Sequence, residues 1–233
     1  MILPQLLARF LRHRDDAVFY RMQAEDAVRW LEANGVRAGD AGAALDLGCG
    51  HGVFGGELLK RGWRVTFADE ANGLRDEFKP HPFRPVNLDT DRIGELGRYD
   101  LVICSNVLEH LAHPKRLIEA APSLLKPGGV FYLSWTNWLS PWGGHEFSPL
   151  HYLGAGLGPR LYDRFASRPR FHTPYRNLFP TYIGSILTEI RANPGLEVRA
   201  MAPRYYTEFG WIMRVPGLRE FAAWNAALLI GRR

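Results

Sequence analysis

A glycine-rich turn between an apolar run and a helical pattern most constrains the fold of this chain. The apolar run ends at Asp46 and Leu47, and glycine then occupies positions 48, 50 and 52. Glycine adopts positive φ and lets a ligand approach the backbone, while the first N–H groups of a helix lack intrahelical partners. Strand, glycine turn and helix in this order predict the entry to a nucleotide-binding βαβ unit.

The spacing of the glycines separates two classes of nucleotide-binding protein. Dinucleotide-binding oxidoreductases carry GxGxxG, whereas this turn has the pattern Asp-x-Gly-x-Gly-x-Gly. A second predicted strand, residues 64–70, ends in Asp69 and Glu70. An acid about 20 residues past the glycines accepts hydrogen bonds from ribose hydroxyls. Oxidoreductases share that acid, so it indicates a nucleoside without naming the cofactor.

Three further segments continue the series after the second strand. They are Pro-Val-Asn-Leu-Asp at 85–89, Tyr-Asp-Leu-Val through Asn-Val-Leu-Glu-His-Leu at 99–111, and Leu-Lys-Pro-Gly-Gly with its apolar continuation at 124–133. Together with the glycine turn, this set resembles the class I S-adenosylmethionine (SAM)-dependent methyltransferases over roughly residues 40–136. The resemblance implies an α/β, Rossmann-like class I methyltransferase fold, with a seven-stranded, mostly parallel sheet and an insertion after strand five.

The chain divides into four parts of one predicted domain. Residues 1–40 form N-terminal helices over 3–11 and 17–33, because their apolar residues recur at helical spacing. Residues 41–136 are the SAM-binding core, 137–180 an insertion, and 181–233 a helix and two strands, at 196–201 and 223–231, the last antiparallel. Three roles are open for the basic first helix: packing over the cofactor site, a contact in a dimer, or contact with a membrane surface.

The resemblance assigns donor-binding roles to particular residues. Gly48, Cys49, Gly50 and Gly52 form a floor of backbone N–H groups, and Asp46 lies beneath it and orients the amino-acid end of SAM. Asp69 takes the ribose hydroxyls, with Glu70 as the alternative acid. The adenine is flanked by Asn87, Leu88 and Asp89, and the methionine part by Ser105, Asn106 and Leu108. The cofactor is therefore SAM, which leaves as S-adenosylhomocysteine.

The insertion, residues 137–180, carries the acceptor site in this interpretation. It contains six prolines, two tryptophans, three histidines and five arginines against two acids, and we expect an irregular segment that covers the acceptor. A long connection of this kind usually carries function, although a solvated loop or dimer arm is the alternative. Its Trp-x-x-x-Trp-Gly-Gly-His-Glu segment resembles actinobacterial glycan and sugar O-methyltransferases of the methylmannose polysaccharide type, which implies a carbohydrate hydroxyl as acceptor.

A hydroxyl acceptor needs a general base, and histidine suits that role near neutral pH. We predict His145 as the base, with His110 as the second candidate. The spacing matches no metal signature, so no metal is predicted, although His145, Glu146 and His151 offer a set of ligands. The predicted acceptor contacts are His51, Trp138, Trp142, Glu146, His151, Tyr152, Tyr175 and Arg176.

Composition excludes several other classes. The net charge of +5 and pI of 9.4 come from scattered arginines without a basic block, so no nucleic-acid partner is predicted. No apolar run reaches the roughly 18 residues of a membrane span. Arg9, Arg12 and Arg14 interrupt any signal peptide, and two isolated cysteines favour reduced thiols in a cytoplasmic protein. A homodimer is left open.

The sequence therefore predicts a SAM-dependent O-methyltransferase of a small or oligosaccharide acceptor. Methylation of a quinone, lipid or amine is the first alternative, because the donor half does not distinguish acceptors. An NAD(P)-dependent oxidoreductase is the alternative outside the methyltransferases.

Overall fold

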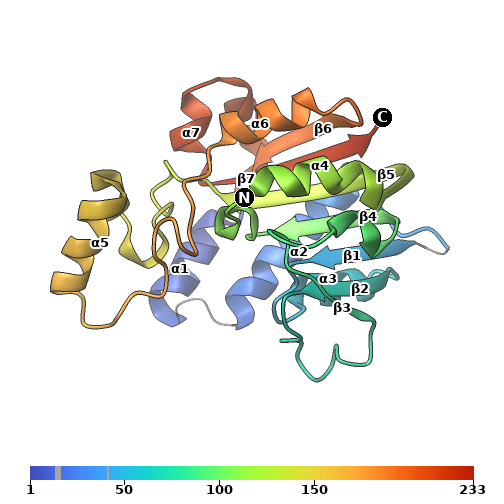
Figure 1. Cartoon of the computed structure of the whole chain (residues 1–233), viewed down its shortest axis with the longest axis horizontal. Helices are drawn as coiled ribbons and strands as arrows, with labels where there is room; N and C mark the ends of the chain where they lie inside the picture. The colour runs from blue at the N-terminus through green and yellow to red at the C-terminus, as the bar shows by residue number, and fades with distance from the viewer. Residues whose placement is uncertain (14–16, 41) are drawn as a thin grey trace.

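A seven-stranded sheet in the order β3-β2-β1-β4-β5-β7-β6 forms the centre of the molecule (Figure 1). The computed structural model describes residues 1–13, 17–40 and 42–233, so Arg14 and the predicted boundary at residue 41 lie outside the described residues. The strands are β1 (Ala43–Leu47), β2 (Arg64–Asp69), β3 (Phe83–Pro85), β4 (Tyr99–Ser105), β5 (Leu125–Thr136), β6 (Leu196–Pro203) and β7 (Asn225–Arg232). The helices are α1 (Leu3–His13), α2 (Ala17–Ala33), α3 (Val53–Leu59), α4 (Pro114–Leu124), α5 (Gly154–Phe165), α6 (Ile183–Ala192) and α7 (Leu218–Ala222).

The strand directions place the functional residues at one edge of the sheet. Strands β3, β2, β1, β4 and β5 run parallel, and β7 lies antiparallel between β5 and β6. This arrangement confirms the predicted mostly parallel sheet with an antiparallel last strand. Because parallel strands end at the same edge, the segments after β1, β2, β4 and β5 are neighbours there.

Alternation along the central strands gives the sheet two apolar faces. On β4, Leu101 and Ile103 pack in a cluster with Val28 and Leu31 of α2 and Leu58 of α3. The residues that alternate with them, Val102 and Cys104, pack in the second cluster, which includes Leu117 and Ile118 of α4 and Ile186 and Leu187 of α6. A strand covered by helices on both faces carries apolar residues at successive positions, as this one does.

Strand β3 ends at Pro85, the first residue of the segment 85–89, because the Asn87 side chain accepts hydrogen bonds from the N–H groups of Asp89 and Thr90 and turns the chain. One local prediction was wrong. The insertion, predicted to be irregular, contains helix α5 and two 3-10 turns. Its glycines and Pro159 conceal the helix in the sequence. Gly158 is required by packing, since a Cβ there would lie 2.2 Å from the carbonyl oxygen of Leu150.

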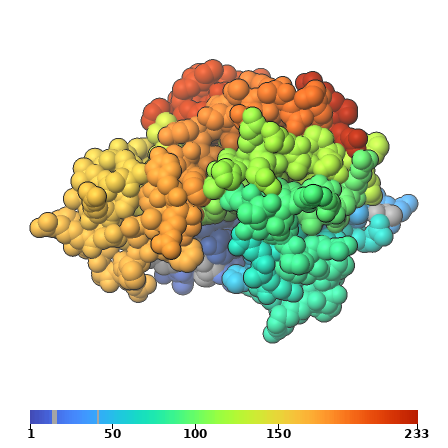
Figure 2. All heavy atoms as spheres, viewed as in Figure 1, coloured from blue at the N-terminus to red at the C-terminus, as the bar shows by residue number. Residues whose placement is uncertain are grey.

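The insertion leaves and re-enters the core at one place. The N–H of Trp138 donates to the carbonyl of Thr181 at 3.1 Å, and the N–H of Phe179 donates to the carbonyl of Glu109 at 2.7 Å. Figure 2 shows the insertion, in yellow and orange, as a lobe beside the green and teal core, with blue N-terminal residues between them. The predicted insertion after strand five is therefore a compact lobe at the edge where the parallel strands end.

The packing of α3 on β2 depends on glycine at position 55. A Cβ at Gly55 would lie 2.2 Å from Cε1 of Phe67, whereas one at Gly156 in α5 meets nothing within 4 Å. We expect Gly55→Ala to lower the free energy of unfolding by roughly 1–3 kcal/mol through overpacking. The matched helical control, Gly156→Ala, should raise it by roughly 0.5–1 kcal/mol. Urea denaturation measures both, and a Gly55→Ala variant as stable as the parent would contradict this account.

Candidate functional site

The glycine turn lies directly after β1 and depends on positive φ angles. Gly48, Gly50 and Gly52 have φ of 72°, 50° and 79°, a region that side-chain-bearing residues rarely adopt. A Cβ at Gly48 would also lie 2.4 Å from Cγ2 of Val107, so the segment after β4 approaches this backbone closely. The turn leads into α3 with Gly52 as its N-cap. The predicted floor of N–H groups is paired within the chain, since Gly48 and Cys49 donate to the carbonyl of Ala68 and Gly52 donates to that of Cys49.

Asp46 lies beneath this turn, as predicted. Its side chain is buried, and Oδ2 accepts a hydrogen bond of 2.7 Å from the N–H of Gly55 in the first turn of α3. Burial, with a smaller contribution from the Asp69 carboxylate, raises the pKa of Asp46 to about 7, although the Gly55 hydrogen bond opposes the shift. Asp46 therefore joins the end of β1 to the start of α3.

Asp69 ends β2 and faces the glycine turn. Its Oδ2 accepts a 2.7 Å hydrogen bond from the N–H of Gly50, and Oδ1 accepts one of 2.7 Å from the N–H of Glu70. The carboxylate of Glu70 instead accepts from Nδ2 of Asn87. Of the two predicted acids, Asp69 is the one in contact with the turn. Cys49, between Gly48 and Gly50, is buried, and burial raises the pKa of its thiol.

Asp89 joins two of the predicted donor-binding segments. Its carboxylate oxygens accept hydrogen bonds from the N–H groups of Ala112 (3.0 Å) and His113 (2.8 Å), and its neighbour Leu88 is buried. The side chain thus holds the segment after β4 against the segment after β3. A bond to adenine would use the lone pairs that these N–H groups leave free.

Asn106 lies immediately after β4, at the centre of a buried polar network. Its backbone has a φ of 56°, and its amide donates to Oε1 of Gln23 and accepts from Nη1 of Arg204 and Nδ2 of Asn225. The preceding residue, Ser105, shares a hydroxyl hydrogen bond with Ser134, and Leu108 is buried. The network fixes the loop that follows β4.

Arg204 is a feature that the sequence analysis missed. It is 2% exposed, yet Nε and Nη2 have no hydrogen-bond acceptor among the described residues. Its guanidinium lies 5.5 Å from the ring of Phe54, at the start of α3, and bonds to Asn106. A buried cation with unpaired donors next to the glycine turn is suited to an anionic group of a ligand, because burying such donors without an acceptor is costly.

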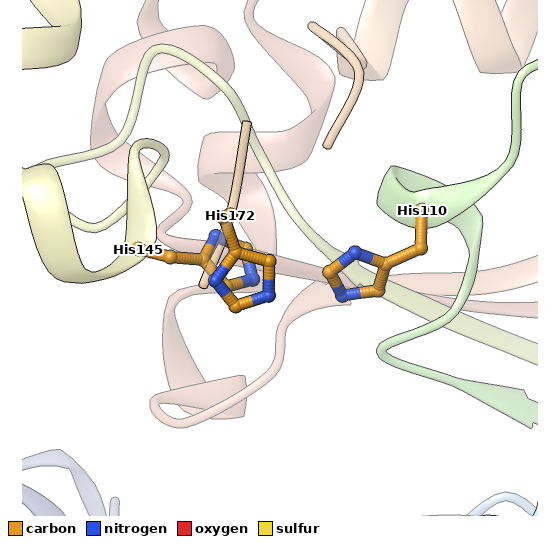
Figure 3. Close-up of side chains that lie close together, drawn as sticks. All are labelled: His110, His145 and His172. Atoms are coloured by element: carbon orange, nitrogen blue, oxygen red, sulfur yellow. The ribbon is translucent and has the colours of Figure 1, made fainter. Parts of the chain in front are cut away.

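Three histidines from separate segments form a second cluster, which Figure 3 shows. The ring centroids of His145 and His172 are 4.4 Å apart, and that of His110 lies 5.3 and 5.2 Å from them. Burial, and then the neighbouring His172 and His110, lower the pKa of His145 to about 3, so its imidazole is neutral near pH 7. The two predicted base candidates, His145 and His110, are therefore in contact. His172 also belongs to the cluster, but no motif around it in the sequence predicted this.

Glu146 supports this cluster from the side of the insertion. Its Oε1 accepts from the N–H groups of Phe171 and His172, and Oε2 contacts Nδ1 of His172 at 2.5 Å. Burial acts to raise the pKa of Glu146, but the hydrogen bonds from His172 outweigh it and lower the pKa to about 2. Glu146 is thus an ionised group that orients His172.

The other predicted acceptor residues are not members of the histidine cluster, although the N–H of His145 donates to the carbonyl of Trp142. His151 and Trp138 are buried against each other in the insertion's own core, and Nε2 of His151 bonds to the carbonyl of Ser140. The structure therefore does not bring His151 into the histidine cluster. Trp142 stacks on Trp224, and Tyr152 donates to the carbonyl of Leu139. His51, Tyr175 and Arg176 are exposed. Nδ1 of His51 contacts the carbonyl of Gly73.

Comparisons with known proteins agree with this architecture. A family model described as a methyltransferase domain matches residues 11–173. An uncharacterised methyltransferase of Mycobacterium sp. (strain JLS) is 32% identical, over 97% of this chain and 92% of its own length. One from Mycobacterium leprae (strain TN) is 31% identical over 98% and 88%.

Solved structures show the same fold. A TehB-like SAM-dependent methyltransferase from Corynebacterium glutamicum has a TM-score of 0.57 at 17% identity, covering 99% of this chain and 96% of its own. Magnesium protoporphyrin IX methyltransferase from Synechocystis, with S-adenosylhomocysteine bound, has a TM-score of 0.57 at 18% identity, covering 94% and 88%.

The chain belongs to the class I SAM-dependent methyltransferases, and SAM is its cofactor. This assignment rules out the oxidoreductase alternative. No helix in the described part of the chain has the length and apolar character of a membrane span.

The raised pKa of Asp46, about 7 against an ordinary 3.8, makes stability depend on pH. Between these values the folded chain holds a proton that the unfolded chain releases, so rising pH destabilises the fold through this window. Asp46→Asn keeps an acceptor for Gly55 but removes the titration. We expect the stability of this variant relative to the parent to increase from near pH 4 to near pH 8, by at most about 4 kcal/mol. Urea denaturation at both pH values tests this, and parallel pH profiles would contradict it.

Proposed function

We propose that this methyltransferase transfers the methyl group of SAM to a hydroxyl of a small acceptor, of the sugar or glycan-precursor class. The observation that supports a hydroxyl is the histidine cluster, since an alcohol must lose a proton as it attacks, whereas an amine needs only to arrive neutral. The cluster includes His110, which ends the short 3-10 turn Leu108–His110 after β4, beside the segment expected to hold the methionine part of SAM.

On the donor side, the glycine turn holds the amino-acid end of SAM, and Asp69 accepts hydrogen bonds from the ribose. The segment Asn87, Leu88 and Asp89 flanks the adenine. Arg204 pairs with the methionine carboxylate, since its unpaired Nε and Nη2 donors lie beside Phe54 and Asn106 and guanidinium donors match a carboxylate. This binding holds sulfur and methyl in line for attack, which supplies much of the catalysis.

The role of Arg204 is tested by two donor analogues. 5′-Methylthioadenosine lacks the amino-acid tail that S-adenosylhomocysteine carries. We expect Arg204→Met to weaken S-adenosylhomocysteine by roughly 10–100-fold, the loss of one charged pair, and to leave 5′-methylthioadenosine unchanged in calorimetry.

The control for this variant is Arg199→Met on β6, which ends immediately before Arg204, and the guanidinium of Arg199 bonds to Glu197. It should bind both analogues like the parent. Equal weakening of the two analogues by Arg204→Met would reject the carboxylate contact.

On the acceptor side, a histidine of the cluster takes the proton of the attacking hydroxyl. His145 is the base candidate, with His110 as the second. Trp142 and Trp224 stack at 5.7 Å, with Phe10 edge-on to Trp142 at 5.4 Å. Aromatic side chains of this kind suit the apolar faces of sugars, which favours a carbohydrate.

The histidine role makes a kinetic prediction. His145→Ala should lower kcat by roughly 10²–10⁴-fold, the usual contribution of a general base, and leave the affinity for S-adenosylhomocysteine near that of the parent. Transfer of a labelled methyl group from SAM to free and 3-O-methylated mannosides measures it, with His113→Ala as control. Unimpaired turnover by His145→Ala would remove the histidine from the mechanism.

A lipid hydroxyl is the second candidate acceptor, for one specific reason. Apolar side chains of the insertion are exposed beside arginines of the same segment: Leu153, Leu157, Phe165, Phe171, Arg160, Arg164 and Arg168. Apolar and basic residues together suit the surface of an anionic bilayer. Methylation of a hydroxylated lipid in vesicles, with no turnover of free mannosides, would favour this acceptor over a sugar.

A further inference from the structure

The histidine cluster has the composition and support of a metal site. We propose that His110, His145 and His172 bind one divalent transition-metal ion, of which Zn²⁺ is the reference. The three residues come from the turn after β4, from the start of the insertion and from its end (Figure 3). They have no metal-ligand spacing in the sequence, because 26 and 34 residues separate them along the chain.

The nitrogen atoms are close enough to share one ion. One ring nitrogen from each of the three residues lies within 4.8 Å of the other two. An ion at about 2.0–2.1 Å from each nitrogen would set them roughly 3.3–3.4 Å apart in tetrahedral geometry. Small side-chain rotations therefore suffice to close the cluster around an ion.

Two of the imidazoles already have the partners that orient metal ligands. Nδ1 of His110 lies 2.8 Å from the carbonyl oxygen of Asn177, and Nδ1 of His172 lies 2.5 Å from Oε2 of Glu146. A carbonyl or carboxylate at Nδ1 fixes the proton there and leaves Nε2 with its lone pair free, as in most histidine metal sites. Both Nε2 atoms are then ready to coordinate.

The third imidazole is held in place with an unused nitrogen. Nδ1 of His145 is buried and has no hydrogen-bond partner among the described residues. The backbone of His145 also adopts a φ of 52°, which costs energy for a residue with a side chain. The proton of the neutral ring can lie on this nitrogen, which leaves Nε2 with its lone pair for an ion.

The ligand set selects the class of ion. Three neutral imidazoles suit Zn²⁺ and similar transition metals, whereas Mg²⁺ and Ca²⁺ prefer carboxylate and carbonyl oxygens. Glu146, the nearest acid, is committed to His172 and serves as its orienting partner.

Three protein ligands leave one position of the ion open. The following consequence rests on the proposed function. An acceptor hydroxyl at that position would lose its proton to solvent more readily, because the cation stabilises the alkoxide. The alkoxide oxygen then forms the bond to the methyl carbon while the carbon–sulfur bond breaks and its electron pair stays on sulfur. With the ion bound, the histidines act as ligands and the ion activates the hydroxyl.

The test is metal binding by the full chain after treatment with a chelator. Calorimetry should give one Zn²⁺ per chain and no binding of Mg²⁺ under the same conditions. Co²⁺ should give the visible absorption of a site with nitrogen ligands. His172→Ala should weaken Zn²⁺ by at least about 100-fold, and Glu146→Gln, which removes an orienting partner, by about 10–100-fold. The control, His113→Ala, has an exposed side chain and should bind Zn²⁺ like the parent.

Absence of Zn²⁺ and Co²⁺ binding by the parent would overturn the proposal, as would equal binding by His172→Ala and His113→Ala. The titration contains no donor or acceptor, so it is independent of the proposed reaction. Zn²⁺ binding without methylation of any hydroxyl would keep the metal site and reject the proposed function. Hydroxyl methylation without metal binding would reject the metal site and keep the proposed function. Retained binding of S-adenosylhomocysteine by His172→Ala shows that the variant is folded.

Discussion

The hydrogen bond from the N–H of Gly55 to the buried carboxylate of Asp46 holds the donor half together. It fixes the start of α3 on the end of β1, and so sets the span that the glycine turn must cross. That span requires three positive φ angles, which is why glycine recurs at alternate positions. Asp69 then meets the turn through Gly50, and Val107 approaches Gly48 from the other side. One buried carboxylate thereby connects β1 and α3, the two elements that the glycine turn joins.

The glycine turn and the insertion differ in how completely their buried polar groups are hydrogen-bonded. Around the glycine turn, most polar groups have a partner inside the chain, as Asp89 has in Ala112 and His113. Among the described residues, buried nitrogen atoms without hydrogen-bond partners are found at Arg204, beside Asn106, at His145 and His151 in the insertion, and at Trp135. Buried polar atoms are rarely left unsatisfied in folded proteins. At Arg204, the methionine carboxylate proposed above would supply the missing acceptor.

Sequence patterns predicted the features that depend on local chemistry. Apolar runs and turn residues predicted the strands β1, β2 and β4 and the helix α2. The resemblance to the methyltransferases implied the antiparallel last strand and the places of Asp46 and Asp69 beside the glycine turn. Helix α5 could not be predicted, because its glycines and Pro159 have low helix propensity, and of its three glycines packing requires Gly158 alone. His172 and Arg204 join their sites through tertiary contacts with residues distant in sequence, for which one chain offers no signal.

The insertion begins and ends at a single point on the core, where Trp138 bonds to Thr181. Because the two ends are tied to each other, the length and sequence of the residues between them can change at little entropic cost and without moving the register of the sheet. The insertion can therefore change in length and sequence while the sheet and the glycine turn stay as they are.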